Sequence, residues 1–152
     1  MNNYNEFFKK QKKNAREIFN NTKSVFCPYF HQNIFFNSNG FHHLRYSSRR
    51  ERSRKEQVLK FNLLPLAINV IKKSGTIQEY RSDFIKNRKN QESKNVAYWA
   101  FIAICGAKTG KNNIKIKVIL RKIGNGNIVF WSVMPYGNFN NQRLYKIGIE
   151  DE

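Results

Sequence analysis

The fold is decided by the stretch Ile114-Lys-Ile-Lys-Val-Ile-Leu-Arg-Lys-Ile-Gly-Asn-Gly-Asn-Ile-Val-Phe-Trp-Ser-Val-Met134. In its first half, apolar residues alternate with residues that are mostly cationic, which predicts a strand with one core face and one largely cationic face. The apolar set is Ile114, Ile116, Val118 and Leu120, and the alternate set is Lys115, Lys117, Ile119 and Arg121. Gly124-Asn-Gly-Asn127 then predicts a tight turn, because Asn-Gly readily supplies positive φ angles. We therefore expect an antiparallel hairpin.

The length of this turn fixes which side chains share a face. A loop of two or four residues places Ser132 opposite Ile119 and diagonal to Arg121, with both polar groups on the cationic face. Val129, Trp131 and Val133 would then point inward. A three-residue loop would instead separate Ser132 from Arg121.

Working outward, the sequence predicts helices first and strands afterwards. Further strands are expected at Thr76–Arg81 and Val96–Ile104, joined by a polar loop over 82–95, and a short strand at Asn33–Asn37. Helices are expected over Asn5–Asn20, from Gly40 after a cap at Ser38 or Asn39, from Ser53-x-x-Glu56 through Lys60, and from Pro65 to Gly75. We expect an α+β fold in which N-terminal helices pack on a four-stranded antiparallel sheet.

Length and composition favour a single domain over residues 1–152. The 152 residues, 40% hydrophobic and 14% aromatic, can bury one core. We divide the chain into a basic helix at 5–20, a core at 33–135 and a polar tail at 136–152. No apolar run is long enough for a membrane span, and Cys27 and Cys105 stand far apart. We expect two free thiols and a cytoplasmic protein without membrane association.

The charge points to a polyanionic partner. Lys and Arg number 28 against 10 Asp and Glu, which gives a formal net charge of +18. Such a field attracts nucleic acid and makes binding salt-dependent. Biased genomic composition is the plain alternative for scattered lysines, but it does not account for the cluster of arginines that follows Arg45.

A histidine-bearing segment, Gly40-Phe-His-His-Leu-Arg45, precedes that cluster. RNA cleavage by its own 2′-hydroxyl needs a base, an acid and cations around the phosphorane. Imidazole titrates near neutral pH and guanidinium stabilises the developing charge. His42 and His43 diverge by about 100° on a helix, so at most one should face a given site, and His43 is preferred.

The sequence also resembles a known family. The residues that carry the resemblance are Ile34-Phe-Phe-x-Ser-x-Gly-Phe-x-His-Leu44, Leu63-Leu-Pro-Leu-Ala67, Gln78-Glu-Tyr-Arg81 and the hairpin up to Pro135. Together they are similar to the phage and plasmid branch of the barnase, EndoU, colicin and RelE nuclease superfamily. The resemblance implies a compact metal-free ribonuclease fold, often that of a toxin, with His43, Arg121 and Ser132 at the motif positions.

We accordingly predict an endoribonuclease that leaves a 2′,3′-cyclic phosphate, needs no metal or cofactor, and meets RNA and an acidic antitoxin or immunity-type inhibitor. The predicted catalytic residues are His43, Arg121, Ser132, Arg50 and His42. The predicted substrate-binding residues are Arg45, Arg49, Arg54, Lys60, Tyr80, Arg81 and Lys117. The main alternative is a non-catalytic RNA- or DNA-binding protein, and a third reading is a protein that docks an acidic partner. Gly106-Ala-Lys-Thr-Gly-Lys111 and Cys27-x-x-x-His31 fail as a phosphate-binding loop and a zinc site.

Overall fold

The computed structural model describes residues 3–86, 93–106 and 113–136. Its helices are α1 (Asn3–Thr22), α2 (Ser38–Arg45) and α3 (Arg54–Lys73). Its strands are β1 (Ser24–Cys27), β2 (Gln32–Phe35), β3 (Glu79–Lys86), β4 (Ser93–Gly106), β5 (Asn113–Ile123) and β6 (Val129–Pro135). The predicted α+β class is confirmed. The prediction of a polar loop over 82–95 is wrong at both ends, because β3 continues through residues 82–86 and β4 begins at Ser93. The middle of that predicted loop and the predicted tail from residue 137 onward lie outside the described residues.

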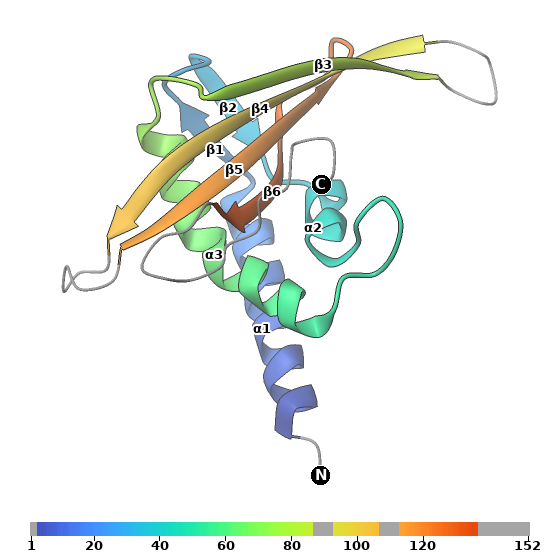
Figure 1. Ribbon diagram of the computed structural model, residues 1–152, viewed down its shortest axis with the longest axis vertical. Helices are drawn as coiled ribbons and strands as arrows, with labels where there is room; N and C mark the ends of the chain where they lie inside the picture. Colours follow the sequence, from blue (N-terminus) through green and yellow to red (C-terminus); the bar gives the residue numbers. More distant parts are fainter. Residues whose placement is uncertain (1–2, 87–92, 107–112, 137–152) are drawn as a thin grey trace.

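The sheet is six-stranded and mixed, in the order β1-β2-β6-β5-β4-β3. The prediction of a four-stranded antiparallel sheet is therefore wrong for the sheet as a whole. Strands β3 to β6 do form the expected antiparallel meander, and β1 and β2 add an antiparallel hairpin. That hairpin joins the meander through one parallel pair, Phe35 with Val129. Figure 1 shows α1 and α3 on one face of the sheet and α2 beside β6.

The helix α3 runs without a break through Pro65, so the prediction of two separate helices is wrong. An internal proline costs about 3 kcal/mol of helix propensity, but burial of apolar residues on both sides of it can exceed that cost. Leu64 and Ala67 are fully buried around Pro65. The predicted cap is confirmed, because the Ser53 side chain accepts a hydrogen bond of 3.1 Å from the Glu56 N–H.

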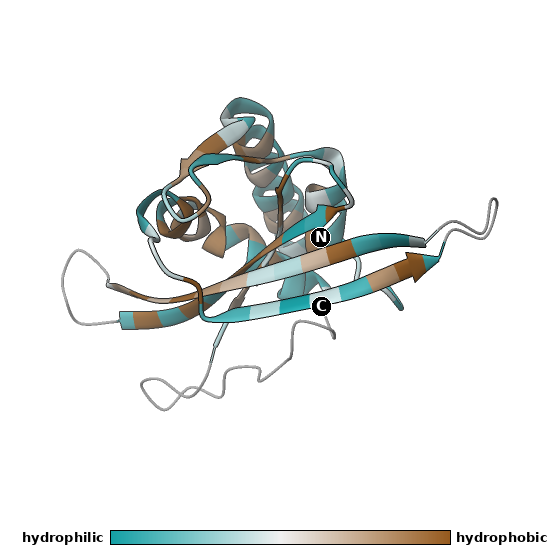
Figure 2. Cartoon of the chain, turned by 90° about the horizontal axis from the view of Figure 1, so that it is seen from above, coloured by the Kyte–Doolittle hydropathy of each residue, from teal (hydrophilic) through white to brown (hydrophobic). Residues whose placement is uncertain are grey.

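The core lies between the helices and the sheet. Figure 2 shows the helices gathered on one side of the long strands. Val118, Leu120 and Phe130 belong to the main buried cluster with residues of α1 and α3. A smaller cluster of Ala100, Ile119 and Met134 lies on the other face of the sheet, with Tyr98 and Trp131 against it. The predicted core face of β5 is thereby confirmed.

Strand β6 departs from regular pairing beside this second cluster. Ser132 pairs with Ile119 as predicted, but a bulge follows, so that Leu120 pairs with Phe130 and Arg121 with Val129. The extra residue is Trp131. The prediction that Trp131 points into the main core is wrong, because the bulge breaks the alternation of the strand. In the turn, the positive φ of 53° falls on Gly124 and not on Asn125.

None of the described helices combines the length and apolarity needed to cross a bilayer. Cys27 and Cys105 are free thiols, as expected.

Candidate functional site

The position of α2 is set by its first turn. The prediction of a cap at Ser38 or Asn39 is wrong, because α2 begins at Ser38 and its cap is Asn37, whose side chain accepts a hydrogen bond of 3.0 Å from the Gly40 N–H. Gly40 lies so close to β6 that a Cβ atom there would be 2.4 Å from the Phe130 carbonyl oxygen. Only glycine lets the two backbones approach this closely. The Gly-Phe-His-His motif therefore brings both histidines against the bulged part of β6.

A cleft of about 360 Å³ opens between α2 and the strands β3 to β6. We call it the central cleft. It is lined by His42, His43, Tyr46, Ser47, Ser48, Arg81, Asp83, Tyr98, Arg121 and Trp131. Imidazole groups from the helix and guanidinium groups from the sheet thus border one cavity. The sequence analysis predicted that an imidazole and a strand arginine belong to one site, and this cleft has both in its lining.

Trp131 joins the two kinds of group. The His43 ring stacks on the Trp131 ring with centroids 4.2 Å apart and an interplanar angle of 18°. The Arg121 guanidinium carbon lies 4.1 Å from the centroid of the same ring. Both contacts favour a fixed geometry, because stacking and cation–π contacts are directional. The tryptophan is exposed to this contact by the bulge, which turns it out of the main core.

Arg121 forms no ion pair with an acidic side chain among the described residues. Its Nε is buried and receives no hydrogen-bond acceptor from residues 3–86, 93–106 or 113–136. The Tyr98 ring also lies near this group, with its centroid 5.7 Å from the guanidinium carbon. A buried donor without an acceptor costs roughly 1–3 kcal/mol. An anionic oxygen arriving in the central cleft would satisfy this group.

The two histidines differ in their surroundings. His43 is 6% exposed, and Arg52 Nη2 lies 3.3 Å from its Nε2 while Arg52 Nε donates to its carbonyl oxygen. Arginine only donates, so this hydrogen bond requires an unprotonated Nε2. His42 is exposed, and its ring stacks on Tyr46 at 4.5 Å. No hydrogen bond to the His42 ring is made by any residue of the described ranges, so this imidazole is available to a ligand.

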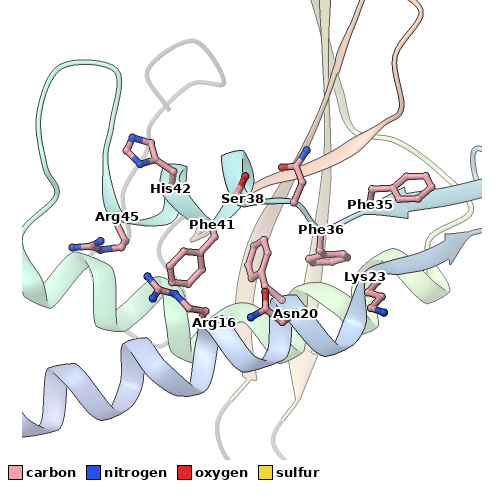
Figure 3. Close-up of a pocket in the computed structure, with 11 residues that line it drawn as sticks. Arg16, Asn20, Lys23, Phe35, Phe36, Ser38, Phe41, His42 and Arg45 are labelled. Atoms are coloured by element: carbon pink, nitrogen blue, oxygen red, sulfur yellow. The ribbon is translucent and has the colours of Figure 1, made fainter.

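Two other clefts border the central cleft. The first, of about 570 Å³ between α1 and α2, is the helix cleft (Figure 3). Figure 3 shows Arg16 and Asn20 of α1 and His42 and Arg45 of α2 along it. Burial and then the nearby Arg45 and Arg16 lower the pKa of Lys12, a sign of crowded positive charge. His42 lines both the helix cleft and the central cleft.

The other, of about 350 Å³, is the amide cleft. Its lining residues are Phe35, Asn37, Asn39, Arg121, Ile123, Gly126, Asn127, Val129 and Trp131. It shares Arg121 and Trp131 with the central cleft. It also shares Phe35 and Asn37 with the helix cleft. The three cavities therefore follow one another around α2.

Three of the predicted residues lie away from the central cleft and are already engaged. Ser132 is fully buried and accepts a hydrogen bond of 3.0 Å from Lys60 Nζ, which also donates to the Val133 carbonyl oxygen at 3.0 Å. Lys117 is 1% exposed and donates to both oxygens of Glu79 at 2.9 and 3.0 Å. The structure does not place these groups where they could contact RNA in this cleft.

The remaining predicted residues are spread over the surface around α2 and β3. Arg45 lies in the helix cleft, with Nε bonded to Gln57 at 3.2 Å. Arg49, Arg50 and Arg54 are exposed, and Arg50 forms an ion pair of 3.4 Å with Glu56. Tyr80 is exposed on β3, while Arg81 lines the central cleft and pairs with Asp83 at 3.2 Å. Of this group, Arg81 lines the central cleft together with Arg121, and Tyr98 of β4 lies between them in the sheet.

The sequence did not indicate six of the residues that line the central cleft, which are Tyr46, Ser47, Ser48, Asp83, Tyr98 and Trp131. Trp131 could not be found from the sequence, because the bulge that exposes its ring leaves no signal in the alternation. The sequence likewise indicates Asn39 and Asn127 only as cap and turn residues. One signal was available: the residue that pairs with Arg121 lies two positions before Trp131, and arginine often stacks on tryptophan.

No group of three or more His, Cys, Asp or Glu side chains suited to a metal ion occurs in residues 3–86, 93–106 and 113–136. Comparison with protein-family models, with curated proteins and with solved structures found no match to this chain.

Proposed function

We propose that this protein is an endoribonuclease that cleaves RNA in the central cleft by attack of the 2′-hydroxyl on the adjacent phosphate, without a metal ion. One observation carries the proposal: an exposed imidazole, His42, and a guanidinium without an acidic partner in the described ranges, Arg121, line the same cavity. These two groups can supply proton transfer and charge stabilisation, which together are what the reaction requires.

His42 is the group that we assign to proton transfer. Its ring is exposed and can accept the 2′-hydroxyl proton and then return it to the leaving 5′-oxygen, a contribution of roughly 10² to 10⁴ in rate. His43 is the positioning residue, because its ring is buried between Trp131 and Arg52. This assignment reverses the order in which the sequence ranked the two histidines.

Arg121 stabilises the phosphorane and Arg81 contributes a second guanidinium at the β3 side of the cleft. The Arg121 guanidinium lies against the Trp131 ring, so the cation is positioned before the substrate binds. Such preorganisation is effective because little reorientation is needed during the reaction. Tyr98 adds an aromatic ring on which a flanking base can stack.

The proposal includes membership of the barnase, EndoU, colicin and RelE superfamily and a role as a toxin held by an acidic inhibitor. The motif resemblance and the four-stranded antiparallel part of the sheet support the family. The formal net charge of +18 supports an acidic inhibitor, since opposite charge accelerates association. A cytoplasmic location belongs to the same proposal.

The proposed reaction is tested by identifying the chemical groups at the ends of the RNA fragments. The full chain is incubated with RNA in excess EDTA, and the fragment ends are identified by mass spectrometry. We expect 2′,3′-cyclic phosphates together with 5′-hydroxyl ends. Intact RNA, or fragments with 5′-phosphates, would contradict the proposed reaction.

The test of the two histidine roles compares His42→Ala, His43→Ala and His43→Phe. His42→Ala should lower the cleavage rate at least about 100-fold with RNA affinity retained. His43→Phe keeps a ring on Trp131 and should recover most of the activity that His43→Ala loses, with the acidic limb of the pH–rate profile unchanged. If His43→Phe is as inactive as His43→Ala while remaining folded, His43 transfers the proton instead.

A non-catalytic RNA- or DNA-binding protein is the second candidate, and the helix cleft favours it. Arg16, Lys23 and Arg45 line that cleft, and two of these cations come from α1 or the residue that follows it. A binder would shift RNA in a gel and leave it intact in the same EDTA reaction. A protein that docks only acidic partners would fail to bind any nucleic acid at low ionic strength.

A further inference from the structure

We propose that the amide cleft is a nucleobase subsite that selects the nucleotide next to the cleaved phosphate. This inference rests on the proposed function and adds sequence preference to it. The ligand class is a single unpaired ribonucleobase, recognised by the side-chain amides of Asn39 and Asn127 and stacked on Phe35. Three features of the cleft carry the inference: its continuity with the central cleft, its amides and its low charge.

The amide cleft opens directly from the central cleft, which places the subsite one nucleotide from the phosphate that is cleaved. Arg121 and Trp131 form the shared wall of the central cleft and the amide cleft. A phosphate that contacts Arg121 therefore has one neighbouring nucleotide at the mouth of the amide cleft. At about 350 Å³, the cavity is within the range of small-ligand sites and can admit a planar base.

The chemistry of the lining suits a base. Phe35 is 37% exposed and Ile123 is 40% exposed, so apolar surface is available for the face of a ring. Asn39 and Asn127 are exposed, and their side-chain amides make no hydrogen bond within the described part of the chain. Sequence-specific recognition of unpaired RNA uses this pair of features, aromatic stacking and hydrogen bonds to base edges.

The distribution of positive charge indicates that the RNA phosphates bind outside this subsite. Among the residues that the structure describes, Arg121 is the one cation in the lining of the amide cleft, and it also lines the central cleft. The helix cleft is lined by Arg16, Lys23 and Arg45, so phosphates are better bound there. An RNA strand that crosses the central cleft would then extend its phosphates toward the cations of the helix cleft. One of its bases would enter the amide cleft and contact Asn39 and Asn127.

Tryptophan fluorescence provides a binding test that does not depend on catalysis. The chain contains 2 Trp, so Trp99→Phe leaves Trp131 as the single reporter, in the wall of the amide cleft. This variant is titrated with each of the four ribonucleoside 3′-monophosphates. We expect quenching by all four, with affinities that differ at least about tenfold between the best and the worst base, the value of one good amide–base pair.

Substitutions identify the groups that select the base. Asn39→Ala and Asn127→Ala, each in the Trp99→Phe background, should reduce the difference among the four nucleotides to about twofold or less. Asn125→Ala is the matched control, because Asn125 is an exposed amide of the same turn outside the cleft lining. Asn125→Ala should keep the full difference in affinity among the four nucleotides.

Cleavage-site sequencing distinguishes failure of this inference from failure of the proposed function. Asn39→Ala and Asn127→Ala should cut RNA at more positions than the native protein, because the groups that select the base have been removed. Equal affinity for the four nucleotides, no binding of any of them, or unchanged cleavage positions in these variants would overturn the subsite. RNA left intact by the native protein would instead overturn the proposed function.

Discussion

Replacing Gly40 with alanine tests whether the approach of α2 to β6 holds the site together. The added Cβ would lie 2.4 Å from the Phe130 carbonyl oxygen, about 1 Å short of an ordinary contact, with Phe19 Cε1 at 3.4 Å on another side. Backbone cannot move aside as a side-chain tip can, so α2 must shift outward. Overpacking of this kind costs typically 1–3 kcal/mol.

Gly75→Ala is the matched control, because a Cβ there meets nothing within 4 Å. Urea unfolding should show Gly40→Ala destabilised by about 1–3 kcal/mol and Gly75→Ala unchanged or stabilised by about 0.4–1 kcal/mol. The shift of α2 should also separate His43 from Trp131 and change the tryptophan emission of the folded protein. Equal stability and equal emission of the two variants would refute this reasoning.

Three more predictions concern stability and thiol chemistry. Ser53→Ala removes the cap of α3 and should lower the free energy of unfolding by about 1 kcal/mol in urea titration, and a change below about 0.3 kcal/mol would contradict the cap's contribution. Glu79→Gln leaves the buried ammonium of Lys117 without its carboxylate and should cost about 3 kcal/mol, whereas Asp83→Asn, at an exposed ion pair, should cost below about 1 kcal/mol. Burial raises the pKa of the Cys27 thiol above its ordinary value of 9.0, so the unfolded chain releases that proton first and stability falls as pH rises beyond about 9. Cys27→Ala should therefore show a flatter decline of stability between about pH 8 and 10, and Cys27 should react with a thiol reagent more slowly than Cys105 in the folded protein.

The strands and helix termini with strong local signals could be predicted from the sequence. The alternation in β5 gave the correct core face, and the Ser53-x-x-Glu56 pattern gave the correct cap of α3. Pro65 misled the helix prediction, because tertiary burial of its neighbours overrides local propensity. The β1–β2 hairpin and its parallel pairing to β6 depend on non-local contacts that no short window of sequence records.

The site was predictable in its parts but not in its arrangement. The sequence correctly indicated that His43 and Arg121 belong together, and the structure places both on Trp131. The roles of Lys117 and Lys60 could not be inferred, because a lysine in an alternating strand or helix gives no sign of a buried partner. The bulge at Trp131 is likewise invisible to a periodicity argument.

The central claim is that RNA is cleaved beside Arg121 in the central cleft. The most direct measurement is the rate of 2′,3′-cyclic phosphate formation in EDTA by Arg121→Ala and by Lys122→Ala. Lys122 is the next cation of β5, and strand alternation places it on the opposite face. We expect Arg121→Ala to lose at least about 100-fold in rate and Lys122→Ala less than about threefold. Equal rates in the two variants, or the absence of cyclic phosphate from the native protein, would contradict the claim.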